Sequence, residues 1–136
     1  MGRVSGRACI VTGAAQGIGR AIGEALLDEG ADVCFADINA EKVAKVAADN
    51  HGRAKANGGR VTSSSVNVTD RAQVNAMVKW TVENFGKLDV VFNNAGVNAP
   101  MGLLDVTEEN WRFIMDINGL GVLIGEQWPS VLEELP

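Results

Sequence analysis

Short apolar runs alternate along the chain with longer segments in which apolar residues recur every three or four positions. The short runs predict strands, and they lie at 7–12, 32–37, 60–68 and 88–93. The run at 60–68 is more polar than the others but is still rich in strand-forming residues.

The periodic segments predict amphipathic helices, because this spacing places the apolar residues on one helical face. Each segment carries a residue type that favours a helix start or a helix end. These residues are Gly30 for the helix over 17–31, Asn39 and Gly58-Gly59 for the second, Thr69 and Gly86 for the third, and Thr107 for the start of the last.

Strand and helix alternate four times, which favours a parallel sheet with helices on both faces. The sequence therefore predicts an α/β fold with a doubly wound parallel sheet of the Rossmann type, shortened to about four strands. Four strands are enough for one mononucleotide-binding half and one further strand. We expect residues 1–136 to form one dinucleotide-binding domain that is incomplete at its C-terminal end.

The composition limits which partners the chain is expected to bind and in which cellular compartment it is expected. The net charge of −5 disfavours nucleic acid and anionic membrane surfaces, which bind basic proteins. No apolar stretch is long enough for a signal or a membrane span. Cys9 and Cys34 lie in predicted strands and read as buried thiols, and a single histidine gives no metal-ligand pattern. These features predict a cytoplasmic protein without a metal site.

The stretch TGAAQGIG, residues 12–19, lies between the first strand and the first helix. A tight turn at this place directs the free N–H groups of the helix toward the end of the sheet, where they favour a pyrophosphate. Side chains at Gly13, Gly17 and Gly19 would block the approach of the backbone to the phosphates. A simple packing turn is the alternative, and a P-loop is excluded because no Gly-Lys-Ser/Thr follows.

Asp37 stands at the end of the second strand. A carboxylate there accepts hydrogen bonds from ribose hydroxyls and repels a 2′-phosphate. Neither Ala15 nor Gln16 on the glycine loop supplies a cation that would attract that phosphate. The sequence therefore favours NAD over NADP, with a solvated strand end as the alternative for Asp37.

The chain contains four short motifs in the order TGAAQGIG (12–19), NVTD (67–70), NNAG (93–96) and DINGLGV (116–122). With these motifs in this order, the chain resembles the N-terminal, cofactor-binding half of the short-chain dehydrogenases/reductases, and the resemblance covers essentially the whole chain. The family usually has Asp where this chain has Asn67, and Asn retains an acceptor oxygen.

The resemblance implies a role for each matching residue. The cofactor-binding set is Gly13, Gly17, Ile18 and Gly19 at the pyrophosphate and the adjoining ribose, Gln16 on the same loop, Asp37 at the adenosine ribose, Asn67 and Val68 at the adenine, and Asn93, Ala95 and Gly96 beside the ribose and the central strands. Asn118 matches the family's proton-relay position. The complete enzyme would exchange a hydride between NAD and a small secondary alcohol or ketone.

The family's chemistry also needs a serine and a Tyr-x-x-x-Lys motif, and this sequence contains no tyrosine. The chain alone is therefore predicted to be inactive, as the front part of a larger oxidoreductase. A stand-alone NAD-binding or hetero-oligomerising module and an inert fragment are the alternatives.

The last helical segment carries a row of apolar residues that the family packs against a partner subunit. We expect them to form an uncovered apolar surface that supports a homo-oligomer, and we expect Pro129 to kink the helix. The residues are Trp111, Ile114, Ile117, Leu123, Ile124, Trp128 and Leu132.

Overall fold

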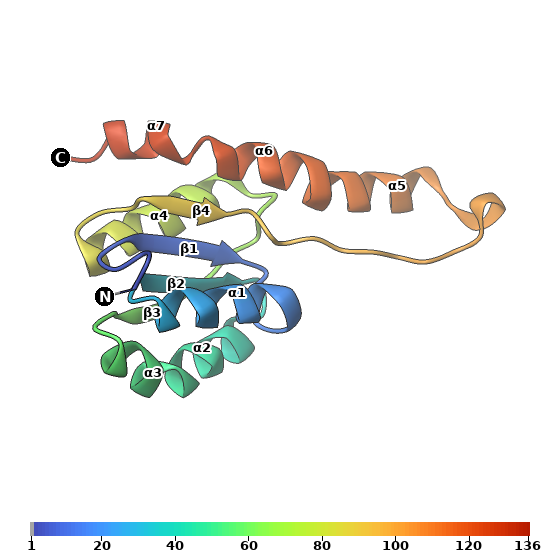
Figure 1. Cartoon of the computed structure of the whole chain (residues 1–136). Helices are drawn as coiled ribbons and strands as arrows, with labels where there is room; N and C mark the ends of the chain where they lie inside the picture. Colours follow the sequence, from blue (N-terminus) through green and yellow to red (C-terminus); the bar gives the residue numbers. More distant parts are fainter. Residues whose placement is uncertain (1) are drawn as a thin grey trace.

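The computed structural model describes residues 2–136 and contains one parallel sheet with the strand order β3-β2-β1-β4. Its parallel strands and flanking helices confirm the predicted doubly wound fold (Figure 1). Every strand is shorter than or equal to its predicted run, and the bounds are β1 (Ala8–Thr12), β2 (Asp32–Asp37), β3 (Val61–Ser65) and β4 (Val90–Phe92).

The helices form two layers, one on each face of the sheet. Their bounds are α1 (Gly17–Asp28), α2 (Ala40–Asp49), α3 (His51–Ala56), α4 (Arg71–Phe85), α5 (Glu108–Met115), α6 (Gly121–Glu126) and α7 (Trp128–Glu133). Helices α1, α2 and α3 pack on one face, and α4, α6 and α7 pack on the other. A 3-10 turn at Leu103–Asp105 and a π-helical turn at Asp116–Leu120 complete the chain.

The two central strands are buried on both faces, which explains their continuous apolar sequences. Alternate side chains of β1 enter different cores: Ile10 lies under α4, and Val11 lies under α1. Helix α1 approaches the sheet so closely that a Cβ atom on Gly23 would lie 2.2 Å from the ring of Phe35.

The second predicted helix is broken at Asn50, which corrects the prediction of one helix reaching Gly58. The Asn50 side chain donates to the Val46 carbonyl at 2.9 Å and to Glu24 at 3.2 Å. These bonds anchor a turn between α2 and α3, a role that short polar side chains often take. The predicted cap at Asn39 is confirmed, because its side chain accepts a hydrogen bond from the Lys42 N–H at 3.0 Å.

Thr69 was the predicted N-cap of helix α4, but the structure shows Asp70 in that position. The Asp70 side chain accepts from the N–H groups of Ala72 and Gln73, at 3.0 and 3.3 Å. Thr69 is engaged elsewhere, because its hydroxyl donates to Asn67 at 2.7 Å. The predicted helix end at Gly86 is confirmed by its left-handed backbone, with a φ of 81°.

Thr107 caps α5, as predicted, and the structure adds a reciprocal pair of bonds between Thr107 and Asn110. The long connection after β4 and helix α5 extend beyond the sheet (Figure 1). The helix is interrupted at Gln127, between α6 and α7. Pro129 lies in the first turn of α7, where proline is tolerated.

The predicted uncovered surface on these last helices is wrong in part. Ile124 is buried and joins the core beneath α4, and Trp128 and Leu132 pack partly buried against that core. Trp111 and Leu123 are 59% and 54% exposed, so the uncovered apolar area lies mainly on α5 and the start of α6. Among residues 2–136, no helix combines the length and the hydropathy that a bilayer crossing requires.

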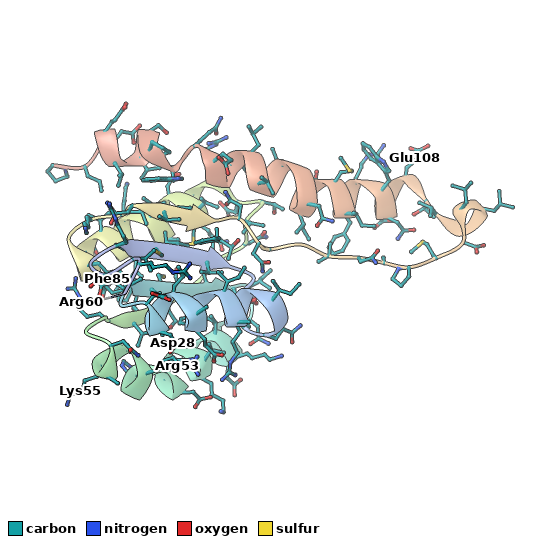
Figure 2. The ribbon with its side chains drawn as sticks, in the orientation of Figure 1. Asp28, Arg53, Lys55, Arg60, Phe85 and Glu108 are labelled. Carbon is teal, nitrogen blue, oxygen red and sulfur yellow. The ribbon has the colours of Figure 1, made fainter. Side chains whose placement is uncertain are left out.

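An ion pair lies at the amino ends of β2 and β3. Asp32, which is buried, accepts from the Arg60 backbone N–H at 2.8 Å and from its guanidinium at 2.6 Å. The same guanidinium donates to the carbonyls of Asn84 and Phe85 and lies over the Phe85 ring, so Arg60 also caps the end of α4 (Figure 2).

Replacing Arg60 with Met is expected to lower the free energy of unfolding by about 1–3 kcal/mol, because Asp32 would lose its charged partner while remaining buried. Arg112→Met is the matched control, since Arg112 pairs with an exposed Glu108 and is expected to cost less than about 1 kcal/mol. Urea titrations of the two variants compare them. Equal losses would contradict this account of Arg60.

Both thiols are expected to resist alkylation in the folded chain. Burial raises the pKa of Cys9 to about 11 and that of Cys34 to about 12, so almost no reactive thiolate forms near neutral pH. Mass spectrometry after iodoacetamide treatment should find neither thiol labelled in buffer and both labelled in guanidinium chloride. Stoichiometric labelling in buffer would show that the strands are accessible.

Candidate functional site

A cavity of about 270 Å³ opens at the carboxyl ends of the strands, where the chain leaves β1, β2, β3 and β4. Strand β1 is flanked by β2 on one side and β4 on the other, so the connections after β1 and β4 diverge here. Doubly wound proteins bind ligands at this point of divergence. The lining residues are Gly13, Gln16, Asp37, Ile38, Val66, Asn67, Val68, Asn94, Ala95, Gly96, Val97 and Ile117.

The glycine loop after β1 has no room for side chains at two of its glycines. A Cβ atom on Gly19 would lie 2.2 Å from the Gly13 carbonyl oxygen and 2.6 Å from the Asn94 side-chain nitrogen. Gly13 adopts a φ of 64°, and a Cβ atom there would lie 2.8 Å from Ala95. The loop is therefore packed backbone to backbone against the segment that follows β4.

The N-terminus of α1 is open at the edge of this cavity. Gln16 occupies the N-cap position but makes no side-chain bond to the helix, and the first turn contains no acidic residue. The first-turn N–H groups of this twelve-residue helix thus keep their capacity to bind an anion.

Thr12 joins the loop after β1 to the segment after β4. Its hydroxyl accepts from the N–H groups of Asn94 and Ala95, at 3.1 and 3.0 Å, and donates to the Phe92 carbonyl at 3.3 Å. The Asn94 side chain returns a bond to the Thr12 carbonyl at 3.1 Å. These four bonds fix one wall of the cavity relative to the other.

The Asp37 carboxylate is fixed by two backbone groups. One oxygen accepts from the Ala15 N–H at 3.1 Å, and the other accepts from the Asn39 N–H at 2.9 Å. A carboxylate has about four acceptor positions, so further donors can still bind. Asp37 is thus held against the glycine loop with spare acceptor capacity.

Asn67 lines the cavity, but its side-chain oxygen is used within its own turn. It accepts from the Thr69 N–H at 3.0 Å and from the Thr69 hydroxyl at 2.7 Å. Val68 beside it packs tightly on α6, where a Cβ atom on Gly121 would lie 2.8 Å from the Val68 side chain.

Asn118 lies in the π-helical turn between α5 and α6, outside the cavity lining. Its side chain accepts from the Val97 N–H and donates to the Val97 carbonyl, both at 2.8 Å. This paired contact attaches the connection after β4 to the last helices. Extra-wide turns of this kind are frequent near functional sites.

The structure brings most of the predicted residues to one place. The cavity is lined by Gly13, Gln16, Asp37, Asn67, Val68, Ala95 and Gly96, whereas Gly17, Ile18, Gly19, Asn93 and Asn118 do not line it. Ile18 is 75% exposed. The Asn93 side chain donates to Glu126 on α6 at 2.9 Å.

Sequence reasoning missed the residues that complete the cavity and its frame. Ile38, Val66, Val97 and Ile117 contribute apolar wall, and Asn94 contributes both wall and frame. Thr12 and Asn94 carried one usable signal, because each is a polar residue at or just beyond the carboxyl end of a strand, where parallel strands bring their ends together.

The model of the family described as "short chain dehydrogenase" matches residues 7–131. The chain belongs to this family. A relative, the 3-oxoacyl-[acyl-carrier-protein] reductase of Thermotoga maritima, is 36% identical over 120 residues, which are 88% of this chain and 47% of that protein. The chain spans about half the length of the curated relatives it matches.

Solved structures of the family superpose closely on the short-chain dehydrogenase fold of this chain. Carveol dehydrogenase from Mycobacterium avium, in complex with NAD, has a TM-score of 0.84 and 30% identity, over 98% of this chain and 52% of that one. A short chain dehydrogenase from Burkholderia cenocepacia, in complex with NADP, has a TM-score of 0.83 and 31% identity, over 94% and 51%.

Gly19→Ala is expected to lower the free energy of unfolding by about 1–3 kcal/mol, because its Cβ atom would collide with the Gly13 backbone. Gly52→Ala is the matched control: it lies in α3 with nothing within 4 Å of the new Cβ atom, and alanine should stabilise by up to about 1 kcal/mol. Thermal unfolding followed by circular dichroism measures both. A neutral Gly19→Ala would contradict the packing described for the loop.

Proposed function

We propose that this chain is the dinucleotide-binding part of an oxidoreductase that exchanges a hydride between a nicotinamide cofactor and a secondary alcohol or ketone. The observation that carries the proposal is the cavity at the divergence of β1 and β4, with the open N-terminus of α1 on its edge. Solved relatives are described as complexes with NAD and with NADP. The family match supports the same assignment.

The residues present fit a dinucleotide. Gly17 has a φ of 56° and nothing within 4 Å of an added Cβ atom, so the loop backbone is open there to a pyrophosphate. The free N–H groups of Gly17, Ile18 and Gly19 would bind it together with the helix dipole. The apolar walls at Ile38 and Val66, with Asn67 and Val68, would take the adenine.

Asp37 would accept hydrogen bonds from the hydroxyls of the adenosine ribose. Its two backbone bonds prevent it from turning away from a 2′-phosphate, so we propose a preference for NAD over NADP. Ala95 and Gly96 would border the nicotinamide half. Asn93 would support that region from behind, through Glu126 on α6.

When bound, the nicotinamide supplies the hydride acceptor or donor. The residues of this chain bind and orient that cofactor, but hydride transfer to a ketone also needs an acid that protonates the alkoxide. The sequence contains no tyrosine to serve as the family's acid. We propose that Asn118 holds the relay position through its contact with Val97, and that this chain alone does not turn over.

The exposed apolar residues of α5 support a second proposal about assembly. Trp111 and Phe113 are more than half exposed, and Met115 and Leu123 are 43% and 54% exposed. We propose that another subunit covers some of these side chains, because exposed apolar residues of this size commonly mark interfaces.

Isothermal titration calorimetry tests the cofactor proposal. The chain is expected to bind NAD⁺ more tightly than NADP⁺, and Asp37→Asn should shift the affinity ratio toward NADP⁺ by about tenfold, because a fixed negative charge beside the 2′-phosphate is removed. Asp105→Asn makes the same change of charge outside the cavity and should leave the ratio unchanged.

If neither dinucleotide binds saturably, the glycine loop is only a packing turn and the cofactor proposal is wrong. Equal shifts in the Asp37 and Asp105 variants would show that net charge, and not Asp37 itself, sets the preference.

A further inference from the structure

Strand β3 forms an outer edge of the sheet, because the strand order places it beside β2 alone (Figure 1). Arg60 and Val66 lie directly before and after β3, and the Arg60 carbonyl and the Val66 N–H both bond to β2. Backbone groups alternate in direction along a strand. Val61, Ser63 and Ser65 therefore direct their N–H and carbonyl groups away from the sheet.

These outward-facing groups have no partner within the chain. Among residues 2–136, no hydrogen bond reaches the backbone N–H or carbonyl groups of Val61, Ser63 or Ser65. An open edge of this kind pairs readily with another strand, and many proteins protect it with a charge or a proline. The run VTSSS carries neither, and none of its residues is fully buried, whereas β1 is buried throughout.

A hollow of about 400 Å³ lies between β3 and α4 beside this edge. Trp80 on α4 is 44% exposed there, and its indole N–H donates to the Thr62 hydroxyl at 3.2 Å, which fixes the ring beside the strand. An added strand would thus gain apolar contact as well as hydrogen bonds. The lining residues are Ser63, Ser64, Ser65, Gln73, Ala76, Met77 and Trp80.

The charges favour an uncharged occupant at this edge. Every residue that lines the hollow is neutral, and so is every residue of β3, although the chain has a net charge of −5. Two copies of an acidic chain repel each other over most of their surfaces. At β3 they can meet without placing like charges opposite one another.

The edge of β3 is also complementary to itself in its hydrogen bonds. If two copies lie antiparallel about a two-fold axis at Ser63, each Ser63 lies opposite the other, and Val61 lies opposite Ser65. All of these positions have outward-facing backbone groups, so each opposed pair exchanges both of its bonds. A two-fold contact of one surface with itself is the commonest form of self-association.

We propose that β3 pairs with β3 of a second copy of this chain, so that the two sheets join into one continuous sheet. Trp80 of each copy is then covered beside the joined strands. The surface differs from the exposed residues of α5, and the inference does not depend on dinucleotide binding.

Cysteine cross-linking tests the register of this contact. Opposed residues that exchange both bonds have Cα atoms about 5.5 Å apart, a separation that a disulfide spans. Ser63→Cys is therefore expected to form a covalent dimer under mild oxidation, severalfold faster than Ser130→Cys. Ser130 is exposed on α7, so its variant measures random collisions of a new surface thiol. Cys9 and Cys34 are buried and do not compete.

Sedimentation velocity over a range of protein concentrations tests the strength of the contact. Trp111→Ser serves as the background, which weakens association through α5. Adding Ser63→Pro is expected to raise the dissociation constant of the dimer by about tenfold, because proline removes an N–H donor from each copy at the centre of the contact. The Ser63 N–H does not face β2, so the ladder within the chain stays intact, and circular dichroism checks the fold.

Equal cross-linking rates for the two cysteine variants would overturn the proposal, and so would a wild type that stays monomeric at every concentration. A chain that becomes monomeric through Trp111→Ser alone would assign the self-association to α5 and would overturn it as well.

Discussion

The close contact between the glycine loop and the segment after β4 is the constraint on which the site depends. Gly13, Gly19 and Asn94 meet where a single additional carbon atom would collide with backbone. Thr12 adds hydrogen bonds that join the same two segments. Because this contact fixes both walls of the cavity, the position of α1 and the direction of its free N–H groups follow from it.

Much of the fold could be predicted because it depends on local sequence. The runs of β1 and β2 are apolar on both faces, and Asn39, Gly86 and Thr107 act on their own helix ends. The frame of the site could not be predicted in the same way. Thr12 and Asn94 are 82 positions apart, and each looks like an ordinary polar residue until the strands are paired. The break at Asn50 was missed because one of its two side-chain bonds is made to Glu24 on α1, which is 26 positions away in the sequence.

Electrostatics around the cavity are also set by folding and not by composition. The chain has a net charge of −5, yet the cavity combines an open helix N-terminus with one acidic and one basic neighbour. Lys42 is five positions from Asp37 in the sequence, but its contact with Gln16 exists only because α2 begins beside the glycine loop. A reading limited to the loop itself finds no cation there.

The alternation of side chains along the central strands places the two cysteines under different helical layers. Cys9 belongs to the core beneath α1, α2 and α3, whereas Cys34 belongs to the core beneath α4, α6 and α7. Each thiol therefore reports on one helical layer. The rates at which the two thiols are alkylated in the folded chain would show which side of the sheet opens first. If a bound dinucleotide slowed the alkylation of Cys9 alone, the layer that carries the glycine loop would be stabilised as a separate cooperative unit.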